Sequence, residues 1–98
     1  MVKHMIIWKF KDSVTDQTKC AQEIKEALEG LVGKIEGLLE MRILANGMDS
    51  SSGDLMMDST FLSRAALEEY QKHPLHQAVA NQFVRPVMEQ RLSFDYER

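Results

Sequence analysis

The chain has 98 residues, of which 44% are hydrophobic and 28% are charged, as in a single folded domain rather than a disordered segment. Its formal net charge of −3 and pI near 5.6 exclude the basic surface that nucleic acids or anionic membranes select, so neither partner is expected. A lone cysteine, Cys20, excludes an internal disulfide or a paired-cysteine metal motif. The sequence has no recognisable signal peptide and no apolar run of roughly 20 residues, so we predict one cytoplasmic domain over residues 1–98.

Residues 2–10 have the β-branched and aromatic composition of a strand. Alternation places five residues on one face: Val2, His4, Ile6, Trp8 and Phe10. Met5 and Ile7 lie on the other face, between lysines. Because apolar side chains occur on both faces, we predict a central strand that is covered on two sides.

A first helix is predicted to begin at Thr15 as its N-cap, with Asp16 in the first turn, where the helix dipole favours an anion. An apolar stripe follows at helical spacing: Cys20, Ile24, Leu28, Leu31 and Ile35. Three glycines are expected to end this helix: Gly30, Gly33 and Gly37.

Residues 38–45 alternate as a second strand, whose predicted apolar face consists of Leu39, Met41, Ile43 and Ala45. Asn46-Gly47 is a strong turn former, and the loop extends through residues 50–53. Residues 55–61 form a third strand, which completes a hairpin with the second.

Ser63 is the predicted N-cap of a second helix that contains Tyr70. The residue before a proline is biased away from helical geometry, so a break is expected at His73-Pro74. A further helical piece ends near Pro86. The last strand then has the clearest alternation in the chain, with one face made of Met88, Gln90, Leu92, Phe94 and Tyr96.

This order of elements predicts an α+β, ferredoxin-like βαββαβ domain, a four-stranded antiparallel sheet with helices on one face. The other sheet face would then carry His4, Ile6 and Trp8, together with Leu55 and Met57. An apolar face of this kind exceeds what a monomer exposes, so a second copy is expected to cover it by sheet-on-sheet packing. The expected assembly is a homodimer that forms a dimeric α/β barrel.

Two segments carry a resemblance to a known family: the start VKHMIIWKFKD, residues 2–12, and YQKHPLH, residues 70–76. With the terminal Phe94-Asp95-Tyr96, they resemble the stress-responsive A/B barrel (Dabb) family over essentially the whole chain. The resemblance implies a dimeric barrel whose two sheets face each other around a cavity. Most members have no assigned activity; plant members are linked to stress responses, and one plant branch cyclises a polyketide intermediate without a cofactor.

All three histidines lie within these motifs and can exchange protons near neutral pH: His4, His73 and His76. The resemblance implies that His4, Tyr70 and His76 line the pocket, with His76 as a base and Tyr70 positioning the substrate. Four further residues are predicted to contact a ligand: Ile6, Trp8, Leu55 and Met57. The cyclase branch has another pocket histidine where this chain has Leu55, and Trp8 narrows the pocket, so its polyketide substrate is not carried over.

The leading prediction is a homodimer that binds a small apolar or aromatic ligand, with cofactor-free acid–base chemistry of cyclase or lyase type at His76 and Tyr70. One alternative is a non-catalytic stress-response or interaction protein, in which these side chains are structural. Another is a cofactor-free monooxygenase or a haem-degrading enzyme of the same barrel. No cofactor is expected. No metal site is predicted either, because residues 31–35 offer only carbonyl groups where some plant relatives have magnesium.

Overall fold

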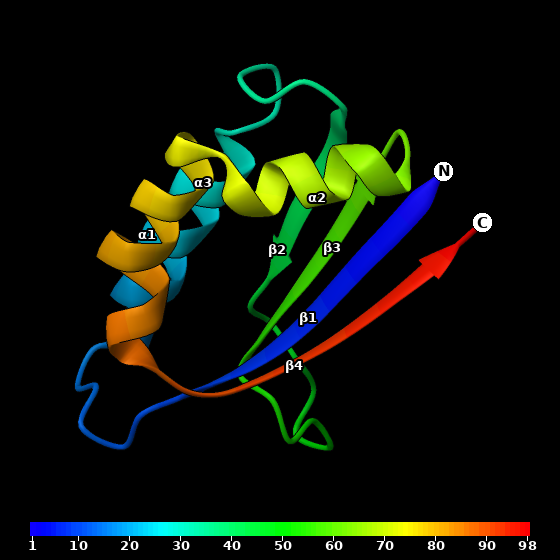
Figure 1. Ribbon diagram of the computed structural model, residues 1–98. Helices are drawn as coiled ribbons and strands as arrows, with labels where there is room; N and C mark the ends of the chain where they lie inside the picture. Colours follow the sequence, from blue (N-terminus) through cyan, green and yellow to red (C-terminus); the bar gives the residue numbers. More distant parts are fainter.

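The computed structural model describes residues 1–98 and contains four strands and three α-helices (Figure 1). The elements in chain order are β1 Val2–Phe10, α1 Gln17–Glu29, β2 Leu38–Leu44, β3 Leu55–Phe61, α2 Arg64–Lys72, α3 Pro74–Val79, η1 Ala80–Val84, η2 Arg85–Val87 and β4 Met88–Glu97. Here η1 is a π-helical turn and η2 a 3₁₀ turn. The strands pair antiparallel in the order β2-β3-β1-β4, which confirms the predicted ferredoxin-like arrangement.

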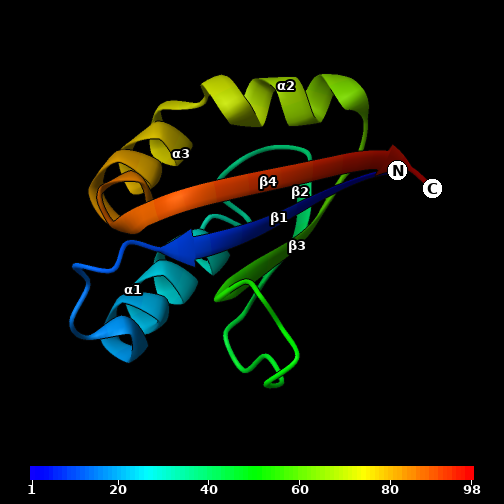
Figure 2. The same ribbon diagram turned by 90° about the horizontal axis from the view of Figure 1, so that it is seen from below.

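The sheet places β1 in its interior, between β3 and β4. The helices α1 and α3 lie side by side, and α2 crosses near one end of β2 and β3 (Figure 1). Both chain ends meet beside β1 and β4 (Figures 1 and 2), where the Arg98 amide donates to the Met1 carbonyl at 2.9 Å. No helix has the length and apolar character that crossing a membrane requires.

Local capping explains where the helices begin and end. Asp16, rather than the predicted Thr15, is the N-cap of α1, and its carboxylate accepts from the Lys19 amide at 3.0 Å. Ser63 caps α2 as predicted. The expected break at His73 is confirmed, because this residue before a proline is extended, with ψ 133°. Its Nδ1 accepts from the Leu75 amide at 3.1 Å, so the same residue caps α3.

The hydrophobic core lies between the helices and one face of the sheet. The predicted stripe of the first helix contributes four buried residues to it: Ile24, Leu28, Leu31 and Ile35. Cys20 packs at the edge of the core and is only half-buried. Leu31 and Ile35 lie beyond the C-terminus of α1, so the stripe continues through the turns that lead into β2.

The structure corrects which sheet face meets the helices. Directly opposed residues of an antiparallel pair share a face, and Ile6 pairs with Met57 while Trp8 pairs with Leu55. These four residues and His4 are at most 4% exposed in the single chain. They therefore face the helices, and the prediction that they form the partner-facing surface is wrong. The sequence of β1 did not distinguish its faces, because Met5 and Ile7 make the other face apolar at mid-strand as well.

The opposite face, which we call the outer sheet face, carries the exposed apolar residues of the strands. Phe94 pairs with Met5, and Leu92 pairs with Ile7. Leu92 and Phe94 are 71% and 69% exposed. The apolar members of the outer sheet face are Met5, Ile7, Leu44, Met56, Leu92, Phe94 and Tyr96.

Two register shifts change the faces predicted for the strand ends. A shift between Lys9 and Phe10 puts Met88 opposite Phe10, so Met88 packs against the core instead of sharing a face with Leu92. A second shift between Leu38 and Glu40 buries Leu38 and leaves Leu39 exposed, contrary to the predicted alternation. Such bulges invert the side-chain alternation on one side of the irregularity.

Candidate functional site

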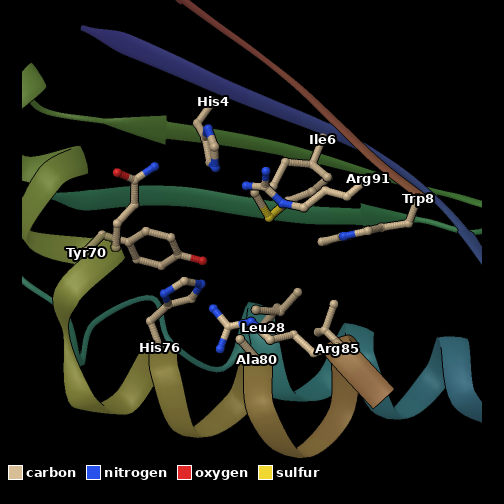
Figure 3. Close-up of a pocket in the computed structure, with 12 residues that line it drawn as sticks. His4, Ile6, Trp8, Leu28, Tyr70, His76, Ala80, Arg85 and Arg91 are labelled. Carbon is tan, nitrogen blue, oxygen red and sulfur yellow. The ribbon is translucent and has the colours of Figure 1, made fainter. Parts of the chain in front are cut away.

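A cavity of about 290 Å³ lies between the sheet and the helices of a single chain (Figure 3). It is lined by His4, Ile6, Trp8, Leu28, Met57, Tyr70, Gln71, His76, Ala80, Val84, Arg85 and Arg91. Figure 3 shows His4, Ile6, Trp8 and Arg91 reaching from the sheet toward side chains that rise from the helices. The cavity that contains His4, Ile6 and Trp8 therefore lies within one chain, and not on the sheet face that was expected to meet a second copy. Its volume is near the lower end of the roughly 300–1,000 Å³ typical of small-molecule sites.

The cavity has an apolar interior and a polar rim. The interior residues are buried: Ile6, Trp8, Leu28, Met57, Ala80 and Val84. Gln71, Arg85 and Arg91 are exposed and form the rim, while His76 is half-buried between the two zones. This arrangement suits a ligand with an apolar body and a polar end.

Tyr70 and His76 form a stacked pair on the helical wall. Their ring centroids are 4.1 Å apart with an interplanar angle of 31°, and Phe61 supports the tyrosine ring at a centroid distance of 4.9 Å. Tyr70 is 1% exposed, and its hydroxyl points into the cavity (Figure 3). Neither this hydroxyl nor His76 Nδ1 has a hydrogen-bond partner in the protein, although both are buried. Since buried polar atoms are nearly always paired, two unpaired atoms on one wall mark this part of the cavity as a candidate binding site.

The surroundings of the pair favour one protonation state. Burial lowers the pKa of His76, and the positive charges of Arg85, His4 and Arg91 lower it further, against a raising effect from the Gln71 backbone. Burial raises the pKa of the Tyr70 phenol, which the charge of Arg91 only partly offsets. At neutral pH the pair is therefore a neutral imidazole beside a protonated phenol, a proton acceptor beside a hydrogen-bond donor.

The lowered pKa of His76 predicts a pH-dependent stability. The unfolded chain has the higher pKa at this site, near 6.5, so it binds more protons than the folded chain between the two pKa values. The contribution of neutral His76 to the free energy of unfolding is therefore fully present above pH 6.5 and is lost as the pH falls toward the folded-state pKa. Urea unfolding should show that the His76→Asn variant loses less stability than the wild type between neutral and mildly acidic pH. Parallel pH profiles for the two proteins would contradict this assignment.

His4 is held in place from the sheet side. Its Nδ1 is paired with the carboxylate of Asp95 on the edge strand β4, and its carbonyl accepts from the Ser59 hydroxyl at 2.6 Å. The carboxylate fixes the orientation of the imidazole, whose other edge is directed toward the cavity (Figure 3). Asp95 was not predicted as part of the site, and only its register opposite His4 identifies it.

The structure brings most of the predicted site residues together. The cavity lining includes His4, Ile6, Trp8, Met57, Tyr70 and His76. Leu55 is buried in the core and is not part of the lining. His73 also lies outside it, at the junction of α2 and α3. No three His, Cys, Asp or Glu side chains are grouped so that they could hold a metal ion.

The sequence analysis missed the charged rim. Arg91 lies opposite Trp8 in the β1–β4 register, so it shares the cavity face of the sheet. Arg85 follows η1 and reaches the cavity from the helical side. The alternation of β4 could have identified Arg91, because this residue lies on the face opposite Leu92 and Phe94.

A four-stranded antiparallel sheet with helices on one face, built in the order βαββαβ, defines a ferredoxin-like α+β protein. More specifically, residues 2–98 match the Stress responsive A/B Barrel Domain, and the chain belongs to this family. It is 30% identical over 89 residues to stress-response A/B barrel domain-containing protein HS1 of Arabidopsis thaliana, covering 85% of this chain and 77% of that protein.

Solved structures share the fold over nearly the whole chain. A dimeric ferredoxin-like protein of unknown function from Bacteroides fragilis superposes with a TM-score of 0.90 at 26% identity, covering 99% of this chain and 95% of that one. The hydroxynitrile lyase of Passiflora edulis superposes with a TM-score of 0.77 at 19% identity, covering 97% and 90%. The second likeness concerns the fold alone.

Proposed function

We propose that this protein is a homodimer that binds a small molecule in the cavity of each protomer and promotes proton transfer on it without a cofactor. His76 is the base, and Tyr70 donates a hydrogen bond to the substrate. The observation that carries this proposal is the pair of buried polar atoms, Tyr70 Oη and His76 Nδ1, which lack protein partners on adjoining rings of one cavity wall.

The chemistry of the pair defines the reaction class. Neutral His76 takes a proton from a carbon next to a carbonyl group, and the electron pair of the broken C–H bond moves onto the carbonyl oxygen as an enolate. Tyr70 donates its hydrogen bond to this oxygen as negative charge develops there. The resulting imidazolium then returns the proton to the substrate or to its leaving group, which restores neutral His76.

The relatives support the two parts of this proposal. The Bacteroides fragilis protein is described as dimeric, and the exposed apolar outer sheet face of this chain supports the same assembly. The Passiflora edulis protein, a hydroxynitrile lyase by name, supports the view that the fold can accommodate a lyase. A two-fold axis would pack the outer sheet faces together and leave each cavity within its own protomer.

The acid–base role can be tested with 5-nitrobenzisoxazole, a neutral probe that opens when a base removes its ring proton. The N–O bond then breaks, and a nitrile and a coloured phenolate form. The wild type should accelerate this reaction, and His76→Ala should slow it by about 100-fold, within the range of a positioned general base. The rate should rise with pH and reach half its maximum below pH 6.5, because the base must be neutral.

A matched histidine variant separates this role from a general effect of histidine. His73→Asn removes an imidazole that lies outside the cavity lining and retains a side chain that can cap α3, so its rate should equal that of the wild type. Circular dichroism and light scattering should show that each variant is folded and has the wild-type oligomeric state. Equal rates for folded wild type and His76→Ala would rule out the acid–base role and favour the non-catalytic alternative.

A further inference from the structure

The cavity rim carries two guanidinium groups that the proposed proton transfer does not use. Arg91 extends from β4 and Arg85 from η2, and Figure 3 shows both groups directed into the space beside Tyr70 and His76. They come from opposite walls, the sheet and the helices. Two cations from separate elements thus converge on one opening.

Neither guanidinium is neutralised by a carboxylate. The ion pairs of the structure use Lys3, His4, Lys25 and Arg64 as their cations. Arg85 donates only to neutral amide oxygens, those of Gln77 at 3.2 Å and of Asn81. The charge of both rim arginines is therefore available to a bound anion.

The cavity has a positive lining in a chain of net negative charge. Its lining contains two arginines but no aspartate or glutamate, whereas the whole chain carries a formal charge of −3. The carboxylate of Asp95 is paired with His4 and lies outside the lining. The buried hydroxyl of Tyr70 adds a neutral donor without a protein partner. Two guanidinium groups and one hydroxyl donor can together bind the oxygen atoms of a small anion.

We propose that the cavity selects small carboxylic acids. The apolar body of the acid lies against Ile6, Trp8 and Leu28, and its carboxylate lies between Arg85 and Arg91. A guanidinium matches the two oxygens of a carboxylate in planar geometry, and the small apolar interior limits the body to a short aliphatic chain or one aromatic ring. This inference rests on the proposed function, because it names the class of molecule that occupies the same cavity.

The chain provides its own reporter of binding. Trp8 is its one tryptophan and lines the cavity, so saturable changes in its fluorescence measure occupancy. Benzoate, phenylacetate and hexanoate should bind about tenfold or more tighter than benzamide, phenylacetamide and hexanamide, which have the same bodies but no charge. Phenyl phosphate should bind more weakly than benzoate.

Charge-removing variants test the two arginines directly. Arg85→Gln and Arg91→Gln should each weaken binding of the acids by about tenfold, with the affinity for the amides unchanged. Arg64→Gln is the charge-matched control, because Arg64 lies on α2 outside the cavity lining and pairs with Glu97. Its affinities should equal those of the wild type.

The alternative outcomes separate this inference from the proposed function. Equal binding of acids and amides would overturn the selection of carboxylates, as would tighter binding of phenyl phosphate, while ring opening of the neutral benzisoxazole would still support His76 as a base. Equal losses for acids and amides in the arginine variants would assign the arginines a structural role and overturn the inference. If no acid or amide changes the fluorescence, the inference fails, and the ring-opening assay then decides the proposed function separately.

Discussion

Replacing Leu92 and Phe94 together by aspartate is expected to convert the protein from a dimer into a folded monomer. Both side chains are largely exposed on the outer sheet face, at 71% and 69%, and β4 is an edge strand. In the proposed two-fold dimer each substitution occurs twice, so four carboxylates would enter an apolar interface without partners. A buried unpaired charge is destabilising by several kcal/mol, so the dimer dissociation constant should rise by more than about 1,000-fold.

Light scattering across a range of protein concentrations measures this change, and circular dichroism checks that the monomer is folded. Met48→Asp is the control, because Met48 is 77% exposed but lies in the loop between β2 and β3 and not on a strand of the sheet. That variant should remain dimeric. A double variant that is still dimeric would contradict the outer sheet face as the interface.

The monomeric Leu92→Asp, Phe94→Asp variant also tests whether the cavity is complete within one chain. All the lining residues belong to one chain, so the monomer should retain the response of Trp8 to carboxylic acids. The sequence analysis placed His4 both on the sheet face that a second copy covers and in the pocket, which would make dimer closure and site formation one event. The register of β1 separates the two, because His4 faces the helices while Met5 lies on the outer sheet face.

The element order was predictable because its signals are local. Ser63 has the side chain of an N-cap, and the residue before Pro74 is restricted by the proline ring itself. Neither signal depends on what packs against the segment. The structure also places His4, Tyr70 and His76 in the lining of one cavity; that they form a functional site stays a prediction.

Which face of the sheet meets the helices could not be predicted from local sequence signals. Met5 and Ile7 make both faces of β1 apolar, so alternation gave two equivalent solutions. The bulge opposite Phe10 depends on how β4 pairs with β1, and it decides that Met88 and Leu92 lie on different faces. Arg91 lies on the cavity face because it pairs with Trp8, so its place in the site follows from how β4 pairs with β1. Strand pairing, rather than composition, therefore determined what the sequence analysis missed.

Replacing Gly37 by alanine is expected to destabilise the protein by about 3 kcal/mol, the sum of a backbone effect and a steric one. Gly37 has a φ of 85°, where an L side chain is strained by roughly 1–2 kcal/mol. The added Cβ would also lie 2.6 Å from the Cβ of Ala66 on α2. The Leu62 amide donates to the Gly37 carbonyl at 2.9 Å, which holds the turn close to the start of α2.

Gly33 offers a matched control for the backbone effect. Its φ is 89°, and an added Cβ would meet no atom within 4 Å, so Gly33→Ala should be destabilising by only about 1–2 kcal/mol. Urea unfolding measures both losses, and their difference isolates the contact with Ala66. Because Tyr70 lies on the same helix as Ala66, the strained Gly37→Ala variant should also bind carboxylic acids more weakly, whereas Gly33→Ala should not.

The double variant Gly37→Ala with Ala66→Gly completes the test. Removing the Ala66 methyl relieves the clash, so the two substitutions should be non-additive by about 1 kcal/mol or more, as expected for residues in contact. Part of the rescue is offset, because glycine in a helix is less favourable than alanine by about 1 kcal/mol. Ligand binding should recover along with stability if close packing of α2 on this turn holds Tyr70 at the cavity wall. Strictly additive losses would instead mean that α2 moves freely away from the turn, and that its position is set by the sheet alone.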